Sequence, residues 1–373
     1  MKKIKVLDCF KDKNFYKIIL ENSPFYVDGK GGQLGDRGSI QGTKILEVPE
    51  ENSVIVNHEL PPGEYFYFID EERRLDIAIQ HTAQHLFSAI AYNDYELNTV
   101  GFRMADNYST VDLDSKELSL HTIEELENKV NDFISKGSHV LINVIPRDEA
   151  NNLSTLRKKI SDKVQDDVRI IEIEGIDTSA CGGFHMENIK DLRVFKIIKY
   201  EKIKGSYTRF YFLAGNRAIE DYSNKTNITN SLIDKFSCKS FEILSMADKL
   251  LEEKKKLETE LRLLSQDCGT MVLEKLLEYP IQWGDKKILF YSGDNRVVNY
   301  ISQNVNTNNY IFIGTWENGG LVTSKTISCG DFAKYLNVLD GNIKGGGNSE
   351  RANLKGNIDK TFILCALENF LKL

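Results

Sequence analysis

The sequence is poor in proline and cysteine, with six of each among 373 residues, and it has no long run of apolar residues. Its apolar runs, such as the one in KILFY, are far shorter than the ~20 residues that a membrane-spanning helix needs. The N-terminal stretch MKKIKVLDCFKDKNFY has lysines but lacks the apolar segment of a signal peptide. These absences predict a cytoplasmic protein with neither a membrane span nor a proline-rich linker.

The cysteines are spread over the chain without paired spacing, so we expect no disulfide framework. In a reducing compartment most of them are expected to be buried thiols. Only Cys181 lies among other candidate metal ligands. The net charge of -7 argues against binding of nucleic acid through overall charge, so such binding would need local basic patches.

The length and the changes of pattern along the chain predict an α+β protein of several parts. Residues 1–70 alternate apolar and polar residues between turns, which predicts a small β-barrel-like module. Residues 71–217 combine helix and strand patterns in a mixed core. Residues 280–373 have the strand–helix–strand order of a C-terminal α/β domain.

Residues 218–279 lack proline and are rich in lysine, glutamate and leucine. An apolar residue recurs there at every seventh position: Phe236, Ile243, Leu250, Leu257 and Leu264. This period predicts one long helix with an apolar seam. The seam can pack on its own domain or form a coiled coil. A homodimer could form through this segment or through the C-terminal domain.

The candidate site begins in the stretch DIAIQHTAQHLFSAI, in which His81 and His85 stand four residues apart in a helical pattern. This spacing puts both imidazoles on one helix face, from which they can reach one metal ion. Taken alone, such a pair is more often structural. A zinc protease of the HExxH kind is excluded, because Thr82 and Gln84 lie inside the motif and neither can act as its general base.

A second pair, in TSACGGFHMEN, repeats this spacing with Cys181 and His185. The two glycines between them let the backbone turn so that the thiolate and the imidazole can converge. One cysteine and three histidines form a ligand set suited to tetrahedral Zn2+. Four protein ligands are typical of a structural site, whereas a catalytic zinc keeps an open position, and both alternatives stay open here.

A glycine-rich stretch, DGKGGQLGDRG, spans residues 28–38 between two strand patterns. It lacks the lysine followed by serine or threonine that a P-loop requires, and it does not open a helix. P-loop and dinucleotide-binding interpretations are therefore disfavoured. By itself the stretch predicts no more than a cluster of β-turns.

In this order, FYVDGKGGQLGDRG, HTAQH and CGGFH resemble the editing half of alanyl-tRNA synthetases, and still more the free-standing alanyl-tRNA editing proteins. The glycine loop is similar to the family motif GGQxxDxG at five positions: Gly31, Gly32, Gln33, Asp36 and Gly38. The family's metal motifs HxxxH and CxxxH match the two pairs above. KGSYTRFYFLAGNRAI resembles the end of the family's editing domain. The heptad segment and GGGNSERA resemble the long helix and C-terminal domain of the long-form proteins.

The resemblance implies a trans-editing hydrolase that serves translation fidelity and needs no ATP. It would use zinc to hydrolyse the ester that joins serine or glycine to the 3′ end of alanine tRNA. A synthetase pocket built for alanine excludes the smaller glycine weakly, and serine adds only a hydroxyl, so a second, hydrolytic site is needed. The implied partner is therefore tRNA(Ala) mischarged with serine or glycine.

The resemblance also implies where the substrate and the RNA bind. The candidate substrate-binding residues are Gly31, Gly32, Gln33, Asp36 and Thr110, the last as a reader of the serine hydroxyl. The candidate RNA-binding residues lie in the C-terminal glycine cluster: Lys344, Gly345, Gly346, Gly347 and Arg351. Bare backbone amides in this cluster could hold phosphate, although a glycine-rich turn is the plainer alternative. Phe184 replaces the family's usual threonine, and its bulk next to two presumed ligands bears on the shape of the pocket.

Two other interpretations remain open. Threonyl-tRNA synthetases use similar metal motifs for editing, so the substrate could be another mischarged tRNA, such as a threonine tRNA. A non-catalytic tRNA-binding module would instead use all four ligands to close a structural zinc site.

Overall fold

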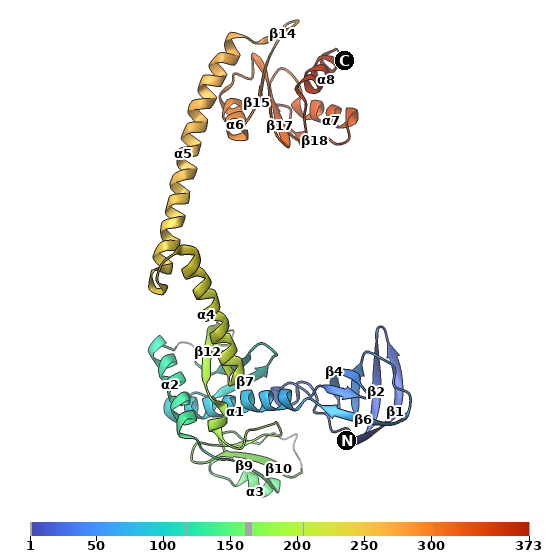
Figure 1. Ribbon diagram of the computed structural model, residues 1–373, viewed down its shortest axis with the longest axis vertical. Helices are drawn as coiled ribbons and strands as arrows, with labels where there is room; N and C mark the ends of the chain where they lie inside the picture. The colour runs from blue at the N-terminus through green and yellow to red at the C-terminus, as the bar shows by residue number, and fades with distance from the viewer. Residues whose placement is uncertain (1, 116–117, 161–165, 204, 373) are drawn as a thin grey trace. The chain divides into compact units, whose positions relative to one another are not determined.

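The computed structural model describes residues 2–115, 118–160, 166–203 and 205–372 (Figure 1). The chain divides into two compact units, Met1–Ser231 and Leu232–Leu373. Across the described ranges, no helix has both the length and the apolar character needed to cross a lipid bilayer.

Residues 2–69 form a closed barrel with the strand order β1-β2-β5-β4-β3-β6, and all its pairings are antiparallel (Figure 1). Its strands are β1 (Lys2–Asp12), β2 (Phe15–Glu21), β3 (Gly38–Ile40), β4 (Thr43–Glu50), β5 (Ser53–Val56) and β6 (Gly63–Ile69). Successive side chains of a strand point to opposite faces, so that Ile4 and Val6 are buried inside while Lys3 and Lys5 are exposed. The barrel in the predicted fold class is confirmed.

Helix α1 (Glu71–Tyr95) follows the barrel (Figure 1), and the first histidine pair belongs to it. Asp70 caps its start, because the Asp70 carboxylate accepts the N–H of Arg73. Every residue from Ile77 to Ala91 is buried. A helix that is enclosed on all sides has no solvent face. This explains why polar side chains in its middle, the two histidines included, lie in the interior.

Two sheets and a second helix complete the mixed core around α1. One sheet has the order β12-β13-β8-β7 and the other has the order β11-β10-β9. Their strands are β7 (Thr99–Met104), β8 (Ser109–Leu113), β9 (Val140–Ile145), β10 (Val168–Ile173), β11 (Asp177–Ala180), β12 (Phe195–Ile203) and β13 (Tyr207–Ala214). The remaining elements are α2 (Leu120–Lys136), α3 (Arg147–Asn151) and the short turns η1 (Lys30–Gly32) and η2 (Ile189–Leu192). Phe87 of α1 packs against Phe195 and Phe210 in the centre of this core.

The heptad segment contains a long helix, but this helix is not continuous over the whole of residues 218–279. Residues 216–278 form two helices, α4 (Asn216–Phe236) and α5 (Ile243–Glu278), separated by the short turn η3 (Ser240–Glu242). Ser237 adopts a left-handed conformation with φ 50°, which ends α4. The Lys239 N–H then donates to the Glu242 carboxylate, which stabilises the turn. The seven-residue spacing runs across this break, so periodicity alone could not reveal it.

The second unit contains a six-stranded sheet in residues 281–355, with the order β14-β15-β16-β17-β19-β18. Its strands are β14 (Ile281–Trp283), β15 (Lys286–Ser292), β16 (Tyr310–Trp316), β17 (Gly319–Thr323), β18 (Lys344–Gly347) and β19 (Arg351–Lys355). Its helices are α6 (Asn295–Asn304), α7 (Cys329–Leu339) and α8 (Lys360–Leu371). Leu289 and Phe312 pack towards α5 and α6, while Ile288 and Ile313 pack towards α7 and α8. Helices therefore cover both faces, and the predicted α/β region is confirmed.

The glycine tract of this unit forms a strand, and not the glycine-rich turn that was the plainer alternative from the sequence. Residues Lys344–Gly347 form β18 at the edge of the sheet and pair antiparallel with β19. A side chain on Gly347 would overlap the backbone of Arg351, and one on Gly345 would crowd Leu354. The glycines thus permit close packing within a hairpin.

Candidate metal centre

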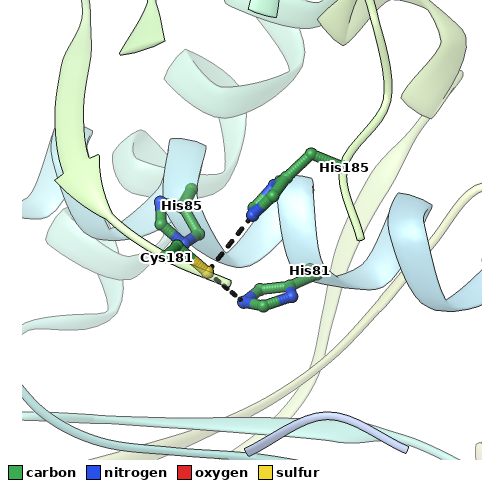
Figure 2. A group of neighbouring side chains, drawn as sticks. All are labelled: His81, His85, Cys181 and His185. Carbon is green, nitrogen blue, oxygen red and sulfur yellow. Dashed lines mark hydrogen bonds between the residues drawn. The ribbon is translucent and has the colours of Figure 1, made fainter. Parts of the chain in front are cut away.

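The two ligand pairs of the sequence converge on one point (Figure 2). His81 and His85 come from consecutive turns of α1, Cys181 follows the end of β11, and His185 lies in the loop beyond it. One donor atom from each of the four lies within 4.8 Å of the others. Cys181 Sγ lies 3.4 Å from Nε2 of His81 and 3.4 Å from Nε2 of His185. The four side chains could therefore hold a metal ion.

The spacing of these donors fits tetrahedral zinc. Zinc–sulfur bonds of about 2.3 Å and zinc–nitrogen bonds of about 2.0 Å, at a tetrahedral angle, separate sulfur from nitrogen by about 3.5 Å. The two sulfur–nitrogen distances of 3.4 Å agree with this value. The donor set of one thiolate and three imidazoles is also the chemistry that zinc prefers.

Each histidine is oriented by a different partner at its Nδ1 atom. The Nδ1 of His81 donates to Oε1 of Gln33 at 2.8 Å, and the Nδ1 of His85 donates to Oδ2 of Asp177 at 3.2 Å. The Nδ1 of His185 lies 3.2 Å from the Thr82 hydroxyl. Such contacts fix the ring and leave Nε2 for a metal ion. The sequence did not identify Asp177 or Thr82 as partners.

The loop from Cys181 to His185 is held by Arg169 of β10. Its guanidinium donates to the carbonyls of Cys181 and Gly183, at 2.8 Å and 2.7 Å. At Gly183 a Cβ atom would overlap the His81 ring and lie 2.5 Å from Gln33 Oε1. Glycine is therefore required at this position for the loop to approach α1.

Hydrogen bonds and burial set the protonation of the four ligands. Burial raises the pKa of Cys181, but its contacts with His185, His81 and His85 outweigh this and lower it to about 2. Burial lowers the pKa of His85, but hydrogen bonds to Asp177 and Cys181 outweigh it and raise the pKa to about 9. Burial lowers the pKa of His185 to about 3 and also lowers that of His81. Near neutral pH the metal-free site thus has a thiolate, one imidazolium and two neutral imidazoles.

The glycine-rich loop of the barrel reaches this site through Gln33. Oε1 of Gln33 accepts the Phe184 N–H at 3.0 Å in addition to the contact with His81. Nε2 of Gln33 is buried without a hydrogen-bond partner among the described residues. Gly32 (φ 80°) lies against β7, where a Cβ would come within 2.8 Å of the Phe102 carbonyl oxygen. Gly31 precedes it in the same turn, in a left-handed conformation.

Asp36 and Thr110 make contacts away from the four ligands. The buried Asp36 carboxylate binds the Arg74 guanidinium through both oxygens, at 2.9 Å and 2.6 Å, and accepts the Tyr26 N–H. Thr110 lies on β8, where its hydroxyl donates to the Arg103 carbonyl across the β7–β8 hairpin. These hydrogen bonds lie within the first unit, and the role of Asp36 and Thr110 in substrate binding stays a prediction.

The C-terminal candidates belong to the second unit. Lys344, Gly345, Gly346 and Gly347 make up the exposed strand β18. Arg351 begins β19, and its guanidinium donates to Oδ1 of Asn299 at 2.8 Å. Their role in RNA binding stays a prediction.

Phe184 packs towards the barrel. Its ring lies 5.0 Å from that of Tyr26, and the Arg74 guanidinium lies 5.0 Å from its centre. Phe184 also borders a hollow of about 400 Å³ that has His185 in its wall. Three carboxylate residues line the same hollow: Glu71, Glu187 and Asp191. Phe184, which stands where the family usually has threonine, therefore packs the ligand loop against Tyr26 and Arg74.

Comparison with known proteins supports the resemblance. Residues 168–211 match the family described as the threonyl and alanyl tRNA synthetase second additional domain, a segment that includes Cys181 and His185. The alanyl-tRNA editing protein Aarsd1 of Danio rerio is 27% identical over 294 residues, which cover 78% of this chain and 71% of the relative. The alanyl-tRNA editing protein AlaX-L of Pyrococcus horikoshii is 26% identical over 297 residues, or 76% of this chain and 72% of the relative.

The chain is similar to alanyl-tRNA editing proteins over most of its length. The resemblance predicted from the three motifs is therefore confirmed. An alanine–tRNA ligase of Nostoc is 28% identical over 288 residues, which are 73% of this chain but 32% of the ligase. The family match at residues 168–211 contains the second ligand pair, Cys181 and His185.

Proposed function

We propose that this protein is an aminoacyl-tRNA deacylase that edits mischarged alanine tRNA in trans. The observation that carries the proposal is the convergence of His81, His85 and Cys181 with His185, oriented in part by the glycine-rich loop of the barrel. The similarity to proteins named as alanyl-tRNA editing proteins supports the same activity. Serine and glycine are the proposed misplaced amino acids, because a site built for alanine excludes them weakly.

Zinc is the proposed metal, with His81, His85, Cys181 and His185 as its ligands. When bound, zinc supplies Lewis-acid chemistry, which polarises an ester carbonyl or lowers the pKa of a water molecule. The residues around it hold the ligands in place, since each imidazole has a partner for its second nitrogen. His81 and His85 are buried, whereas Cys181 and His185 are partly exposed, so the site is open to a substrate on the side of His185.

Two features support a substrate position next to His185. The hollow of about 400 Å³ is large enough for an aminoacyl group. Its carboxylates Glu71, Glu187 and Asp191 suit the positively charged α-ammonium group of an aminoacyl ester. Gln33 is proposed to bind the ester through its Nε2 group, because a buried donor without a partner is costly unless a ligand satisfies it.

The remaining parts of the proposal concern larger partners. Lys344 and Arg351 with the glycines of β18 are proposed to contact tRNA, since Lys344 lies on the exposed edge strand β18 and Arg351 on the neighbouring strand β19. A homodimer is proposed through α5, because its heptad leucines Leu250, Leu257 and Leu264 are 56%, 64% and 65% exposed in the single chain. Sedimentation of wild type and Leu257→Glu tests this part, and a monomeric wild type rules it out.

The decisive experiment measures release of serine from seryl-tRNA(Ala), with alanyl-tRNA(Ala) as the control and zinc assayed on the same sample. Rapid serine release with alanyl-tRNA(Ala) spared, and about one zinc per chain, is the expected result. Cys181→Ala should lose both zinc and deacylation, whereas Cys268→Ala, which removes an exposed cysteine, should lose neither.

Two outcomes would replace the proposal. Release from a mischarged threonine tRNA alone would keep the chemistry and change the substrate, which the family description also allows. Bound zinc without release from any aminoacyl-tRNA would favour a zinc-stabilised tRNA-binding module. In that case loss of a ligand should unfold the first unit, which circular dichroism of Cys181→Ala would detect.

A further inference from the structure

A buried ion pair contacts His85 at its Nδ1 atom. Asp177 accepts the Nδ1–H of His85 on Oδ2, and it binds Arg157 on both oxygens. Nε of Arg157 lies 2.7 Å from Oδ1, and Nη2 lies 3.3 Å from Oδ2. The side chain of Arg157 is 9% exposed and that of Asp177 is 1% exposed.

Arg157 is held in this position by the chain on either side of the pair. It lies in the segment after α3, and its backbone N–H donates to the carbonyl of Thr178 at 3.0 Å, next to Asp177 in β11. Its Nη2 also donates to the hydroxyl of Ser179 at 3.1 Å, and that hydroxyl donates to Oδ2 of Asp177 at 2.9 Å. Oδ2 of Asp177 therefore accepts from three donors, which are His85, Arg157 and Ser179.

We propose that Arg157 is a positioning residue of the metal centre, which orients His85 by fixing the carboxylate of Asp177. The planar guanidinium grips both carboxylate oxygens, so it sets the plane of the carboxylate as well as its charge. The carboxylate plane in turn sets the direction of the His85 ring and thus of its Nε2 atom.

The three histidines differ in a way that gives this pair particular weight. His81 and His185 contact the neutral side chains of Gln33 and Thr82, whereas His85 contacts a carboxylate. A carboxylate makes the imidazole a more basic ligand, but a buried carboxylate must itself be paired. Arg157 meets that requirement with its shortest contact on Oδ1, at 2.7 Å, while His85 donates to Oδ2. The inference depends on the proposed ligand set and not on the proposed substrate.

The test compares full-length Arg157→Met and Arg157→Lys with wild type. Arg157→Met keeps the length of the side chain without its charge, and Arg157→Lys keeps the charge without the fork. The matched control is Arg217→Met, which removes another largely buried arginine that grips Asp76 on the same helix α1 but contacts none of the ligands. Zinc affinity is measured by competition with a chromophoric chelator, and ligand geometry by the visible absorption of the cobalt-substituted protein.

Arg157→Met is expected to bind zinc about tenfold to a hundredfold more weakly and to change the cobalt spectrum. Arg157→Lys should recover part of the affinity, and Arg217→Met should match wild type in both measurements even where its melting temperature falls. Asp177→Asn should weaken zinc binding similarly, and adding Arg157→Met to it should cause little further loss, because both act through the same contact.

Wild-type zinc affinity and an unchanged cobalt spectrum in Arg157→Met would overturn the proposal, and the pair would then only stabilise the fold. If Arg157→Met does not fold, Arg157→Lys decides the question in the same measurements. A Lys variant that folds and equals wild type in affinity and spectrum would also overturn it. None of these measurements uses tRNA, so a protein without deacylase activity can still pass or fail them.

Discussion

Nδ1 of His81 donates to Oε1 of Gln33 at 2.8 Å, so a candidate ligand on helix α1 is oriented by a side chain from the barrel. The same Gln33 oxygen accepts the N–H of Phe184 in the ligand loop. One amide therefore connects the barrel, the helix and the loop. This arrangement explains how a glycine-rich stretch near the N-terminus can contribute to a site built from later residues.

Gln33→Ala should weaken both the fold and the metal centre. It leaves the N–H groups of His81 and Phe184 without their acceptor in a buried place, which costs about 1–3 kcal/mol. Zinc affinity should fall about tenfold to a hundredfold, since His81 is no longer oriented. Urea unfolding and chelator competition measure the two effects. Gln282→Ala, at an exposed site, is the control, and equal behaviour of the two variants would contradict the role of Gln33.

Gly183→Ala should disrupt the metal centre, whereas Gly182→Ala should not. A Cβ on Gly183 would overlap the His81 ring and crowd Gln33, while a Cβ on Gly182 meets nothing within 4 Å. We expect at least a tenfold loss of zinc affinity, or about 1.4 kcal/mol, in the first variant alone. Chelator competition on both proteins decides the matter, and a Gly183→Ala protein with full affinity would show that the loop can move away.

Phe184→Thr should lower stability without loss of zinc. The ring contacts Tyr26 and Arg74, and such an aromatic pair and cation–π contact are each worth about 1 kcal/mol. We therefore expect the free energy of unfolding to fall by about 1–2 kcal/mol, as measured in urea. A variant that retains its stability but loses zinc would mean that Phe184 acts on the ligands instead.

Glu187→Gln should raise the KM for mischarged tRNA about twofold to fivefold, with kcat and zinc affinity unchanged. The expected size follows from an exposed charge pair of up to about 1 kcal/mol with the α-ammonium group. Steady-state deacylation measures it, and Glu174→Gln, which does not line the hollow, is the control. An unchanged KM in Glu187→Gln would place the amino group elsewhere.

The stability of the metal-free protein should rise with pH up to about pH 6.5 and then level off. Cys181 and His185 have pKa values lowered to about 2 and about 3, so the folded state binds fewer protons than the unfolded state in the acid range. His85 acts in the opposite sense, because its pKa is raised to about 9. Its contribution is complete below about pH 6.5 and is lost as the pH rises through about 9.

Between about pH 6.5 and about 8.5, the gain from Cys181 and the loss from His85 should therefore cancel. The urea midpoint of chelator-treated wild type should be flat there. In His85→Ala the loss of stability from His85 is absent. The urea midpoint should therefore keep rising with pH until the thiol of Cys181 ionises in the unfolded state, near pH ~8.5. Identical profiles for both proteins would contradict the charge assigned to His85.

Local patterns predicted the parts of the site that lie close together in the sequence. The period of a helix places His81 and His85 on one face, and two glycines allow Cys181 and His185 to converge. The alternation of apolar and polar residues in 1–70 predicted a β-barrel module, because successive side chains of a strand point to opposite faces of the sheet. The heptad pattern failed at Ser237, where a single left-handed residue ends α4 without disturbing the spacing.

The sequence by itself therefore determined the ligand pairs, the fold class and the resemblance to alanyl-tRNA editing proteins. Only the tertiary structure decided which side chains orient the ligands, since Gln33 and His81 are 48 residues apart and Asp177 and His85 are 92 apart. It also revealed Arg157 behind Asp177 and turned the C-terminal glycines into a strand. No periodicity encodes such contacts, because they form only when separate elements pack and buried polar groups must find partners.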